Sequence, residues 1–430
     1  MKKNHSLSAT SFVAMMLTSF VIAALLSACG GGGGGGGAET KTGFGGTGDP
    51  TPPADALTAS GPLSSIGVAG IAATGLDDRA STIFINTQGG QSFNALKLGM
   101  VAEVTGTVPA TSTSTTPGIA TSIIVQSAIV GSVSGVDPIS QRLRVGPILV
   151  QVDQNTIFEG VTSLSALSLI VDSRVEVYGL PFSDGLSFSN GRGILATRLI
   201  SLPSTGPSDV SSPVELLGIA TTVNAFQFGL PGVSVSISQV SSVTTPTGAV
   251  PGTSSIVENT RVRVVGNLFP PKGFATLGLF SLGASQIVAG IPIVRNDNTV
   301  IVLDGIVQSV TASGRFRLND TDVDTTAANA ATVTVGSRVQ VKGRKVAGVL
   351  TATDFRRIAA GERIQYIVQG DIANLVSTAN FTVRGESINA STATFVGGTA
   401  ANLVNGRTVR IKAQAISGHL EAIEVSFVVS

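Results

Sequence analysis

The chain has 430 residues, of which 43% are hydrophobic, 12% charged and 5% aromatic, and its formal net charge is +1. A soluble domain usually carries about 25% charged residues, so this chain has half the ordinary charge. A net charge near zero argues against electrostatic capture of nucleic acid or of an anionic membrane surface, and no nucleic-acid partner is expected. Two histidines and one cysteine exclude most imidazole and thiol chemistry, so no cofactor and no metal is expected.

The first 28 residues have the layout of a secretory signal peptide. Lys2 and Lys3 give a positive start, and residues 12–26 form an apolar run that is short for a membrane span of about 20 residues. The run ends in Leu26-Ser27-Ala28, directly before the only cysteine of the chain, Cys29. These four residues resemble the lipobox of bacterial lipoproteins. The alternative is an ordinary secretory peptide that leaves Cys29 as a chance thiol.

The lipobox resemblance implies that the chain is cut before Cys29 and that acyl chains such as palmitate are attached to the sulfur and to the new amino group. Two or more acyl chains hold a protein stably on a membrane, whereas one does so only marginally. Gly30 follows the cysteine in place of Asp, which in such lipoproteins favours the outer membrane. We therefore expect a cell-envelope protein, lipid-anchored in the outer membrane and facing the periplasm or the surface.

Residues 29–60 are predicted to be a flexible tether. Eight consecutive glycines, Gly30–Gly37, follow the cysteine, and a stretch rich in Gly, Thr and Pro continues to about Ser60. A glycine-rich coil of this length reaches roughly 30 Å. Such a tether would hold the folded part away from the lipid surface.

One pattern recurs five times in the remainder of the chain. A residue that tolerates a left-handed backbone begins each copy, and alternating apolar and polar residues follow. The copies begin at Gly99, Asp172, Asn259, Gly336 and Gly406. The alternation predicts a strand with one buried face and one wet face, and the wet positions include Glu103, Glu176, Arg263, Gln340 and Arg410. A second strand, which mostly starts with Ala-Thr or Ala-Ser, follows each copy.

These repeats predict an all-β protein of five tandem small barrels after the signal peptide and the tether. The predicted β modules span residues 61–128, 129–205, 213–290, 299–360 and 364–430. In the second module, three meandering strands, a short helical link and two more strands follow the order of an OB-like closed barrel. The opening strand of the first module is degenerate. Modules of this size bury little surface alone, so we expect neighbouring modules to pack on one another.

The second module carries the motifs of a known family. It contains Gly131-Ser-Val-Ser-Gly-Val-Asp137, Thr156-Ile-Phe158, Val175-Glu-Val-Tyr-Gly179 and Ala196-Thr-Arg-Leu199. These motifs resemble the repeats of bacterial lipoproteins called domain of unknown function 5666, and the likeness extends over roughly residues 61–430. Asp172, Asn259 and Ala413 depart from it, because Gly is usual at all three positions. The resemblance implies export and a small barrel, and it brings no catalytic residues.

Two features could suggest chemistry, and both have a simpler interpretation. His419 is the only histidine after the predicted cleavage, and we interpret it as a hairpin-turn residue. Asp320, Asp322 and Asp324 have the spacing that opens an EF-type calcium loop. The sixth and twelfth positions of that loop are Thr325 and Ala331 in place of Gly and Glu, so we interpret the segment as a turn and a strand. No catalytic residues are predicted.

Basic residues gather on the last two strands of the fourth module. They are Lys342, Arg344, Lys345, Arg356 and Arg357. OB-like barrels bind oligosaccharides or oligonucleotides on one strand face, so these residues are a candidate contact for an envelope polysaccharide or another polyanion. The alternative is an ordinary solvated strand face.

The leading hypothesis from the sequence is a non-enzymatic, lipid-anchored scaffold or binding protein of the cell envelope, with a polysaccharide or a protein as its partner. The second hypothesis is a polysaccharide- or polyanion-binding protein that uses modules four and five. An enzyme that relies on carboxylates alone is a third reading, but no pair of carboxylates has a spacing that supports it.

Overall fold

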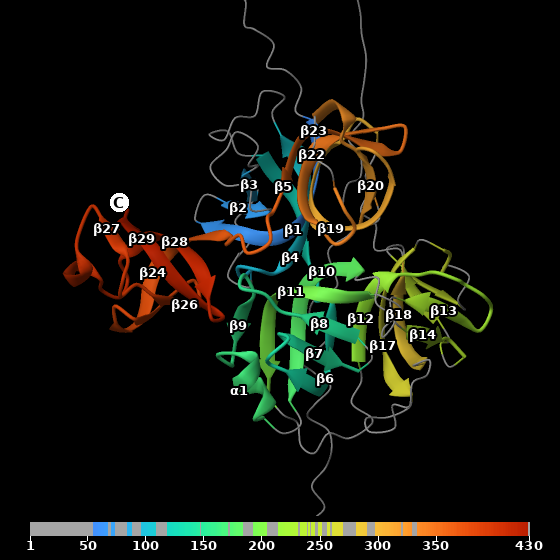
Figure 1. Cartoon of the computed structure of the whole chain (residues 1–430), viewed down its shortest axis with the longest axis horizontal. Helices are drawn as coiled ribbons and strands as arrows, with labels where there is room; N and C mark the ends of the chain where they lie inside the picture. Colours follow the sequence, from blue (N-terminus) through green and yellow to red (C-terminus); the bar gives the residue numbers. More distant parts are fainter. Residues whose placement is uncertain are drawn as a thin grey trace, which may run out of the picture. The chain divides into compact units, whose positions relative to one another are not determined.

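The computed structural model describes most of the chain after residue 54 (Figure 1). The described residues are 55–67, 70–73, 84–87, 96–108, 118–146, 148–170, 173–183, 192–203, 214–230, 233–238, 240, 242–245, 248–251, 256–258, 260–269, 281–289, 297–319, 321–328 and 333–428. The predicted signal peptide, Cys29 and the tether as far as residue 54 lie outside them, as do Asp172, Asn259 and Asp320. Residues 52–430 form one compact unit.

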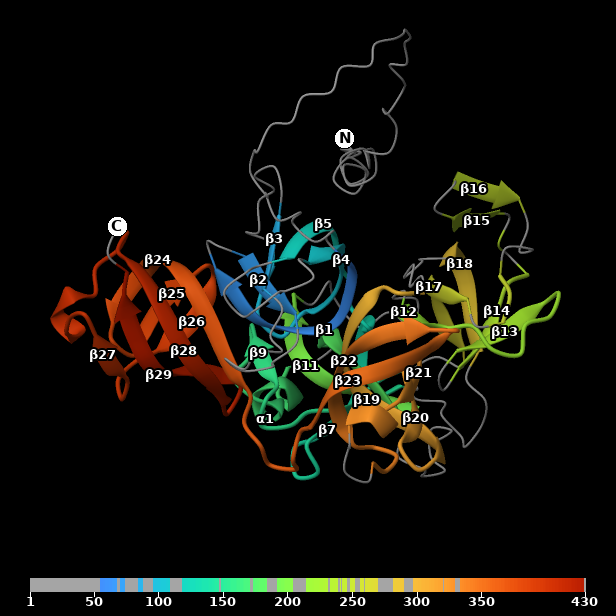
Figure 2. The same cartoon turned by 90° about the horizontal axis from the view of Figure 1, so that it is seen from above.

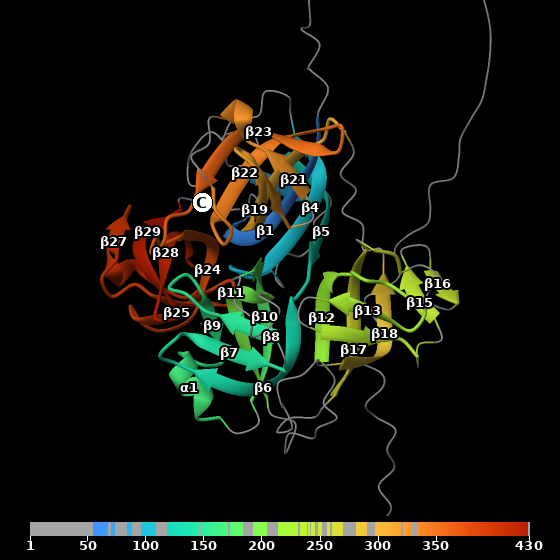
Figure 3. The same ribbon diagram turned by 45° about the vertical axis from the view of Figure 1, so that its right-hand side comes forward.

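The second module is a closed ring of five strands, seen at the lower left of Figure 3. Its elements are β6 (Ile129–Asp137), β7 (Arg142–Val145), β8 (Ile148–Gln151), β9 (Ile157–Glu159), α1 (Leu164–Ser168), β10 (Arg174–Ser183) and β11 (Arg192–Leu202). β6, β7 and β8 form an antiparallel meander, and β11 pairs parallel with β8 and antiparallel with β10. β10 returns to β6 and closes the ring. Closure removes the free edges of these five strands, and β9 adds to the ring by pairing with β11 alone.

The same order of pairing is seen in four other segments of the described chain. The first has β1 (Asp55–Gly67), β2 (Gly70–Ala73), β3 (Phe84–Thr87), β4 (Val101–Val108) and β5 (Gly118–Val125). The fourth has β19 (Val300–Ala312), β20 (Arg315–Leu318), β21 (Thr321–Asp324), the short helix η3 (Thr326–Ala328), β22 (Arg338–Val346) and β23 (Val349–Arg357). The fifth has β24 (Gln365–Ser377), β25 (Asn380–Val383), β26 (Glu386–Asn389), β27 (Thr394–Val396), η4 (Ala400–Asn402), β28 (Thr408–Ile416) and β29 (His419–Phe427).

The third module follows the scheme with an extra hairpin. Its strands are β12 (Val214–Ile219), β13 (Gln227–Leu230), β14 (Val233–Ser236), β15 (Ser242–Thr245), β16 (Gly248–Pro251), β17 (Arg261–Phe269) and β18 (Ser281–Ala289). β15 and β16 form the added hairpin, visible in Figure 2. A single bridge between Thr221 and Gly229 joins the end of β12 to β13. The predicted all-β class with small closed barrels is confirmed, and the closer likeness to OB barrels stays a prediction.

The boundary of the first module needs a correction. Strand β1 begins at Asp55, so residues 55–60, which were expected in the tether, belong to the barrel. Leu57 and Ala59 are 2% and 1% exposed, and β1 pairs with β4 along eight residues. The opening strand is therefore long, and only its pairing with β2 is interrupted, by a register shift between Leu63 and Ser65. Its alternation was hidden because it directly follows a stretch rich in Gly, Thr and Pro.

The turn residues predicted to start each strand copy are confirmed where they are described. Gly99, Gly336 and Gly406 have φ of 78°, 84° and 83°, the left-handed region that favours glycine. They lie two residues before β4, β22 and β28, respectively. The chain therefore turns sharply there before it enters the ladder.

A β-bulge occupies the same place in all five barrels. The ladder between the last two strands shifts register at Gly106, Gly179, Gly266, Gly343 and Ala413. The extra residue on the opposite strand is Thr121, Thr197, Ser285, Thr353 and Ile423. In the first four barrels its hydroxyl donates a hydrogen bond to the carbonyl before the glycine, at 3.0–3.3 Å. The repeated Ala-Thr or Ala-Ser motif is thus the sequence signature of this bulge.

Strand pairing between barrels does not follow the order of the chain. β1 pairs parallel with β19 of the fourth module and with β24 of the fifth, which creates one sheet of 16 strands. β6 pairs with β12, which joins the second and third modules in a sheet of 13 strands. The expectation that each module packs on the next holds for the second and third. The first module instead joins the fourth and fifth.

Candidate ligand cavity

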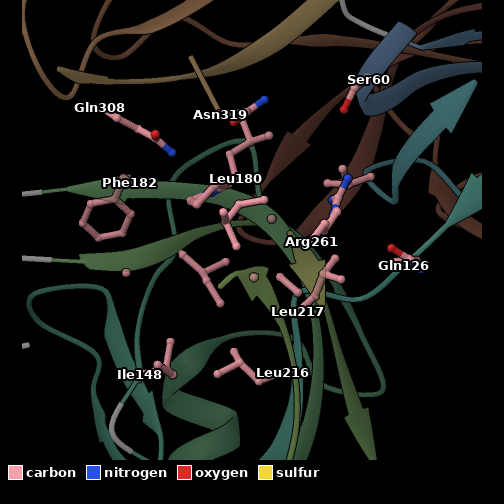
Figure 4. A pocket seen from close by; sticks show the side chains of 18 of the residues that line it. Ser60, Gln126, Ile148, Leu180, Phe182, Leu216, Leu217, Arg261, Gln308 and Asn319 are labelled. Atoms are coloured by element: carbon pink, nitrogen blue, oxygen red, sulfur yellow. The ribbon is translucent and has the colours of Figure 1, made fainter. Parts of the chain in front are cut away.

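A cavity of about 430 Å³ lies where side chains of the first four modules meet (Figure 4). Pockets for small molecules usually measure 300–1,000 Å³ and combine an apolar lining with a few polar groups. The labelled side chains separate by character in Figure 4. Ile148, Phe182 and Leu216 lie on the left and at the bottom, whereas Gln308, Asn319 and Ser60 lie along the top.

The apolar wall comes mainly from β10, β11 and β12. Phe182 on β10 pairs with Gly193 on β11, and a Cβ at Gly193 would lie 2.6 Å from the Phe182 Cζ atom. Glycine at this position therefore lets the ring lie close against the neighbouring strand. Leu180 and Ile194 continue the wall and are 2% and 6% exposed. β12 adds Leu216, which is 4% exposed.

An ion pair between modules crosses the polar side of the cavity. Glu103 on β4 of the first module pairs with Arg261 at the start of β17 of the third, and their side chains are 8% and 22% exposed. A buried carboxylate is costly unless a cation compensates it, and Arg261 supplies that cation to Glu103. The sequence predicted Glu103 on a solvent-exposed strand face. It is buried because the outer face of the first barrel is covered by the third module.

A hairpin of the fourth module supplies the remaining polar rim. Gln308, Ser309, Arg317 and Asn319 all line the cavity, and Ser309 and Arg317 are direct partners across β19 and β20. The Arg317 side chain is 39% exposed, and its Nη1 atom lies 3.5 Å from Oδ1 of Asp322, whose side chain is 62% exposed. An exposed pair at this distance holds Arg317 only weakly.

Besides Oε1 of Glu103, which lies in the ion pair with Arg261, two side-chain oxygens of the cavity lining have no hydrogen-bond partner among the described residues. They are Oε1 of Gln126 and Oδ1 of Asn319, and both atoms are buried. A buried polar atom that finds no partner costs about 1–3 kcal/mol. Both atoms have almost no accessible surface, so a ligand in the cavity reaches them only if their side chains turn. The volume of the cavity and its combination of an apolar wall with a polar rim distinguish it from an ordinary packing gap.

A second polar cluster is fully engaged and links three modules. Arg198 on β11 is 2% exposed and donates to the Leu98 carbonyl at 2.8 Å, to Glu386 at 3.1 Å and to Glu159 at 2.6 Å. Lys97 forms a further ion pair with Glu159. Burial alone would lower the pKa of Arg198, but Glu386 and Glu159 raise it overall. This cluster holds the first, second and fifth modules together.

The five basic residues predicted on the fourth module do not form one surface. Partners across an antiparallel ladder share a face, so Lys342, Arg344 and Arg356 lie on the outer face of β22 and β23. Lys345 and Arg357 pair with Leu350 and Val339 and therefore belong to the opposite side. Arg344 forms an ion pair with Asp55, and Arg356 forms one with Glu362. Two of the three cations on the outer face are thus already paired with carboxylates.

The structure also shows where His419 and the aspartates of the predicted turn and strand lie. His419 follows the tight turn Ser417–Gly418 and pairs with Ile416, which confirms its place at a hairpin turn. Asp322 and Asp324 lie on β21 and pair with Arg317 and Arg315 on β20. In the described part of the chain, no three His, Cys, Asp or Glu side chains gather as metal ligands. No helix among the described residues is long and apolar enough to span a membrane.

The cavity itself was not foreseen from the sequence. Its residues come from four modules, and nothing in the alternation of a single strand indicates which outer face meets another barrel. Gln340 shows the same effect as Glu103: it was expected on a wet face and is 1% exposed. It donates to Asp304, which also binds Arg338.

Comparison with known proteins gives one match. The model of the family described as Domain of unknown function (DUF5666) matches residues 130–188, which cover most of the second barrel. This segment is therefore similar to that domain, as its motifs suggested. Curated proteins and solved structures give no match to the chain.

Proposed function

We propose that this protein is a non-enzymatic binding protein of the cell envelope, held to the outer membrane by lipid on Cys29. The cavity among the four modules is the observation that carries the binding role, because it has the volume of a small-molecule pocket and combines an apolar wall with a polar rim. The five barrels serve as the scaffold that holds this cavity together. The Leu26-Ser27-Ala28-Cys29 segment and the glycine tract support the anchor.

Membrane fractionation and intact mass of the wild type and of Cys29→Ser test the anchor. We expect an acylated wild type in the outer-membrane fraction and a soluble, unmodified variant. If both proteins are soluble and unmodified, the anchor is wrong and the glycine tract is an ordinary amino-terminal tail.

Native mass spectrometry of protein purified from its own envelope tests the binding role. We expect a non-covalent small-molecule adduct on the wild type that is lost in Leu217→Trp, whose larger side chain would fill the cavity. Ile139→Trp is the matched control, because Ile139 lies on the turn after β6 and is 97% exposed. An adduct that survives in Leu217→Trp would place binding elsewhere.

A second candidate is a polysaccharide- or polyanion-binding role for the fourth and fifth modules. Lys342, Arg344 and Arg356 share the outer face of one ladder, which favours it. The ion pairs to Asp55 and Glu362 weigh against it. Charge reversal at Lys342, Arg344, Lys345, Arg356 and Arg357 should abolish retention on an envelope-polysaccharide column, and unchanged retention would exclude this candidate.

A further inference from the structure

We propose that the cavity takes a single-chain amphiphile with an anionic head group, and that Arg317 recognises the head. This inference rests on the proposed binding function and specifies its ligand. The shared chemistry is one apolar chain with one carboxylate or phosphate. The separation of apolar and polar side chains in Figure 4 is the first support, because a ligand that matches both parts must itself be apolar at one end and polar at the other.

The charges that line the cavity favour an anion. Glu103 is the one carboxylate among the lining residues, and Arg261 already compensates it. Arg317 is a second cation, and its partner Asp322 is well exposed and 3.5 Å away. A carboxylate or phosphate from a ligand can therefore replace Asp322 at a small cost, and a charged head on a guanidinium forms a strong, charge-assisted hydrogen bond.

The groups around Arg317 can hold the rest of a polar head. Ser309 lies directly across the ladder from Arg317, and Asn319 follows two residues later with its Oδ1 atom buried and without a hydrogen-bond partner among the described residues. A carboxylate or phosphate head accepts hydrogen bonds, so the Ser309 hydroxyl and the Asn319 amide nitrogen are the donors that suit it.

The apolar wall suits a chain better than a sugar ring. Leu180, Ile194 and Leu216 are aliphatic and almost fully buried, and Phe182 packs against Gly193. These side chains offer no hydrogen bonds to the hydroxyl groups that surround a saccharide. Burying an apolar chain against them instead gains free energy with each methylene group.

Isothermal titration calorimetry of the full chain that carries Cys29→Ser tests the proposal, because this protein needs no detergent that would compete for the cavity. The probes are dodecanoate, dodecyl phosphate, methyl dodecanoate and a glucose oligosaccharide. We expect both anions to bind, the ester to bind at least about tenfold more weakly, and the oligosaccharide not to bind. The two anions distinguish a carboxylate from a phosphate head.

Arg317→Gln should weaken both anions about tenfold or more and leave the ester unchanged. Arg315→Gln is the matched control, since Arg315 lies on the same strand, pairs with Asp324 and does not line the cavity. Leu217→Trp, and independently Gln308→Trp, should abolish binding of all three dodecyl probes, whereas Ile139→Trp should not. Circular dichroism of each variant checks that it is folded.

Equal binding of ester and anion, or an Arg317→Gln variant that binds like the wild type, would overturn the assignment of the head group. Binding of the oligosaccharide without the dodecyl probes would overturn the amphiphile class. If native mass spectrometry shows an adduct but calorimetry shows no binding of any dodecyl probe, this inference is overturned and the proposed binding function stands. If neither an adduct nor probe binding is seen, the proposed binding function is overturned as well.

Discussion

Arg198 and Glu386 are 2% and 2% exposed, although they lie in the second and fifth barrels and far apart in the sequence. Their contact excludes water from both charges, and the backbone of Leu98 in the first barrel completes it by donating to Glu386 and accepting from Arg198. Polar residues on the outer faces of the barrels thus form contacts that connect different modules. We expect the contribution of such an ion pair to the free energy of unfolding to depend mainly on how deeply the pair is buried.

Replacement of Arg198 should be strongly destabilising. Arg198→Met leaves Glu386 buried without its cation, and breaking a buried pair in this way costs about 3–5 kcal/mol. Arg263→Met is the control, because the Arg263–Glu215 pair has side chains 41% and 21% exposed and should contribute about 1 kcal/mol or less. Urea unfolding of both variants measures the difference. Equal losses would mean that burial of the pair does not matter.

Glu159 should make stability depend on pH in the acidic range. Burial alone would raise its pKa, but Lys97 and Arg198 lower it below the ordinary value of about 4.5. A carboxylate whose pKa is lower in the folded state stabilises the fold above about pH 4.5, and this contribution is lost as the pH falls through the folded-state pKa. Glu159→Gln should therefore lower the urea midpoint at pH 7, and the difference from the wild type should shrink as the pH is lowered below about 4.5. A pH-independent difference would contradict this.

Each barrel depends on the bulge between its last two strands. At Gly343 an added Cβ would lie 2.1 Å from the Thr351 carbonyl oxygen and 2.8 Å from the Ala352 Cα atom. Both atoms belong to the backbone, so they cannot move aside as a flexible side chain would. In the fifth barrel, Ala413 stands in place of this glycine and Ile423 stands in place of the bulged Thr or Ser. Both residues of the bulge therefore differ from those of the other four barrels.

Gly343→Ala should destabilise the fourth barrel by about 1–3 kcal/mol, because the ladder must shift to make room for the methyl group. Gly135→Ala on β6 is the control, since a Cβ there meets nothing within 4 Å. Alanine at such a strand position is expected to be neutral or slightly stabilising. Thermal unfolding followed by circular dichroism compares the two. A harmless Gly343→Ala would mean that the bulge does not require glycine.

At the scale of the whole molecule, β1 is the strand on which three barrels depend. It pairs with β4 in its own barrel, and at Ala59 it pairs with both Val104 and Val302. Further along, Ser65 and Ile66 pair with β24. The core follows the same plan, because one hydrophobic cluster includes buried residues of the first, fourth and fifth barrels together. The segment that follows the predicted tether is therefore integral to the fold.

Ala59→Pro should loosen the contact between the first and fourth barrels. Proline removes one N–H from the ladder, and a lost buried hydrogen bond costs about 1–3 kcal/mol. Hydrogen exchange should accelerate in β1, β4 and β19. The β13–β14 hairpin, which has no strand pairing with β1, serves as an internal reference and should exchange as in the wild type. Equal acceleration in all strands would indicate global destabilisation instead.

Repetition is what made the barrels predictable. The turn glycines, the alternation of valine with polar residues and the Ala-Thr motif recur in order, and each depends on contacts within one module. The opening strand of the first barrel was misplaced because composition, which marks tethers, outweighed a short alternation at Leu57 and Ala59. The cavity could not be predicted, since it requires knowing which outer faces meet.

The sequence by itself determined the all-β class, the repeated small barrel, its turn glycines and the position of His419. These features depend on residues close in the chain or on backbone geometry that only certain residues allow. The tertiary structure alone decided that β1 joins β19 and β24, that Glu103, Gln340 and Arg198 are buried, and that four modules enclose a cavity. Contacts between modules rest on matching surfaces far apart in the sequence, and alternation within a strand says which residues face outward but not what they meet.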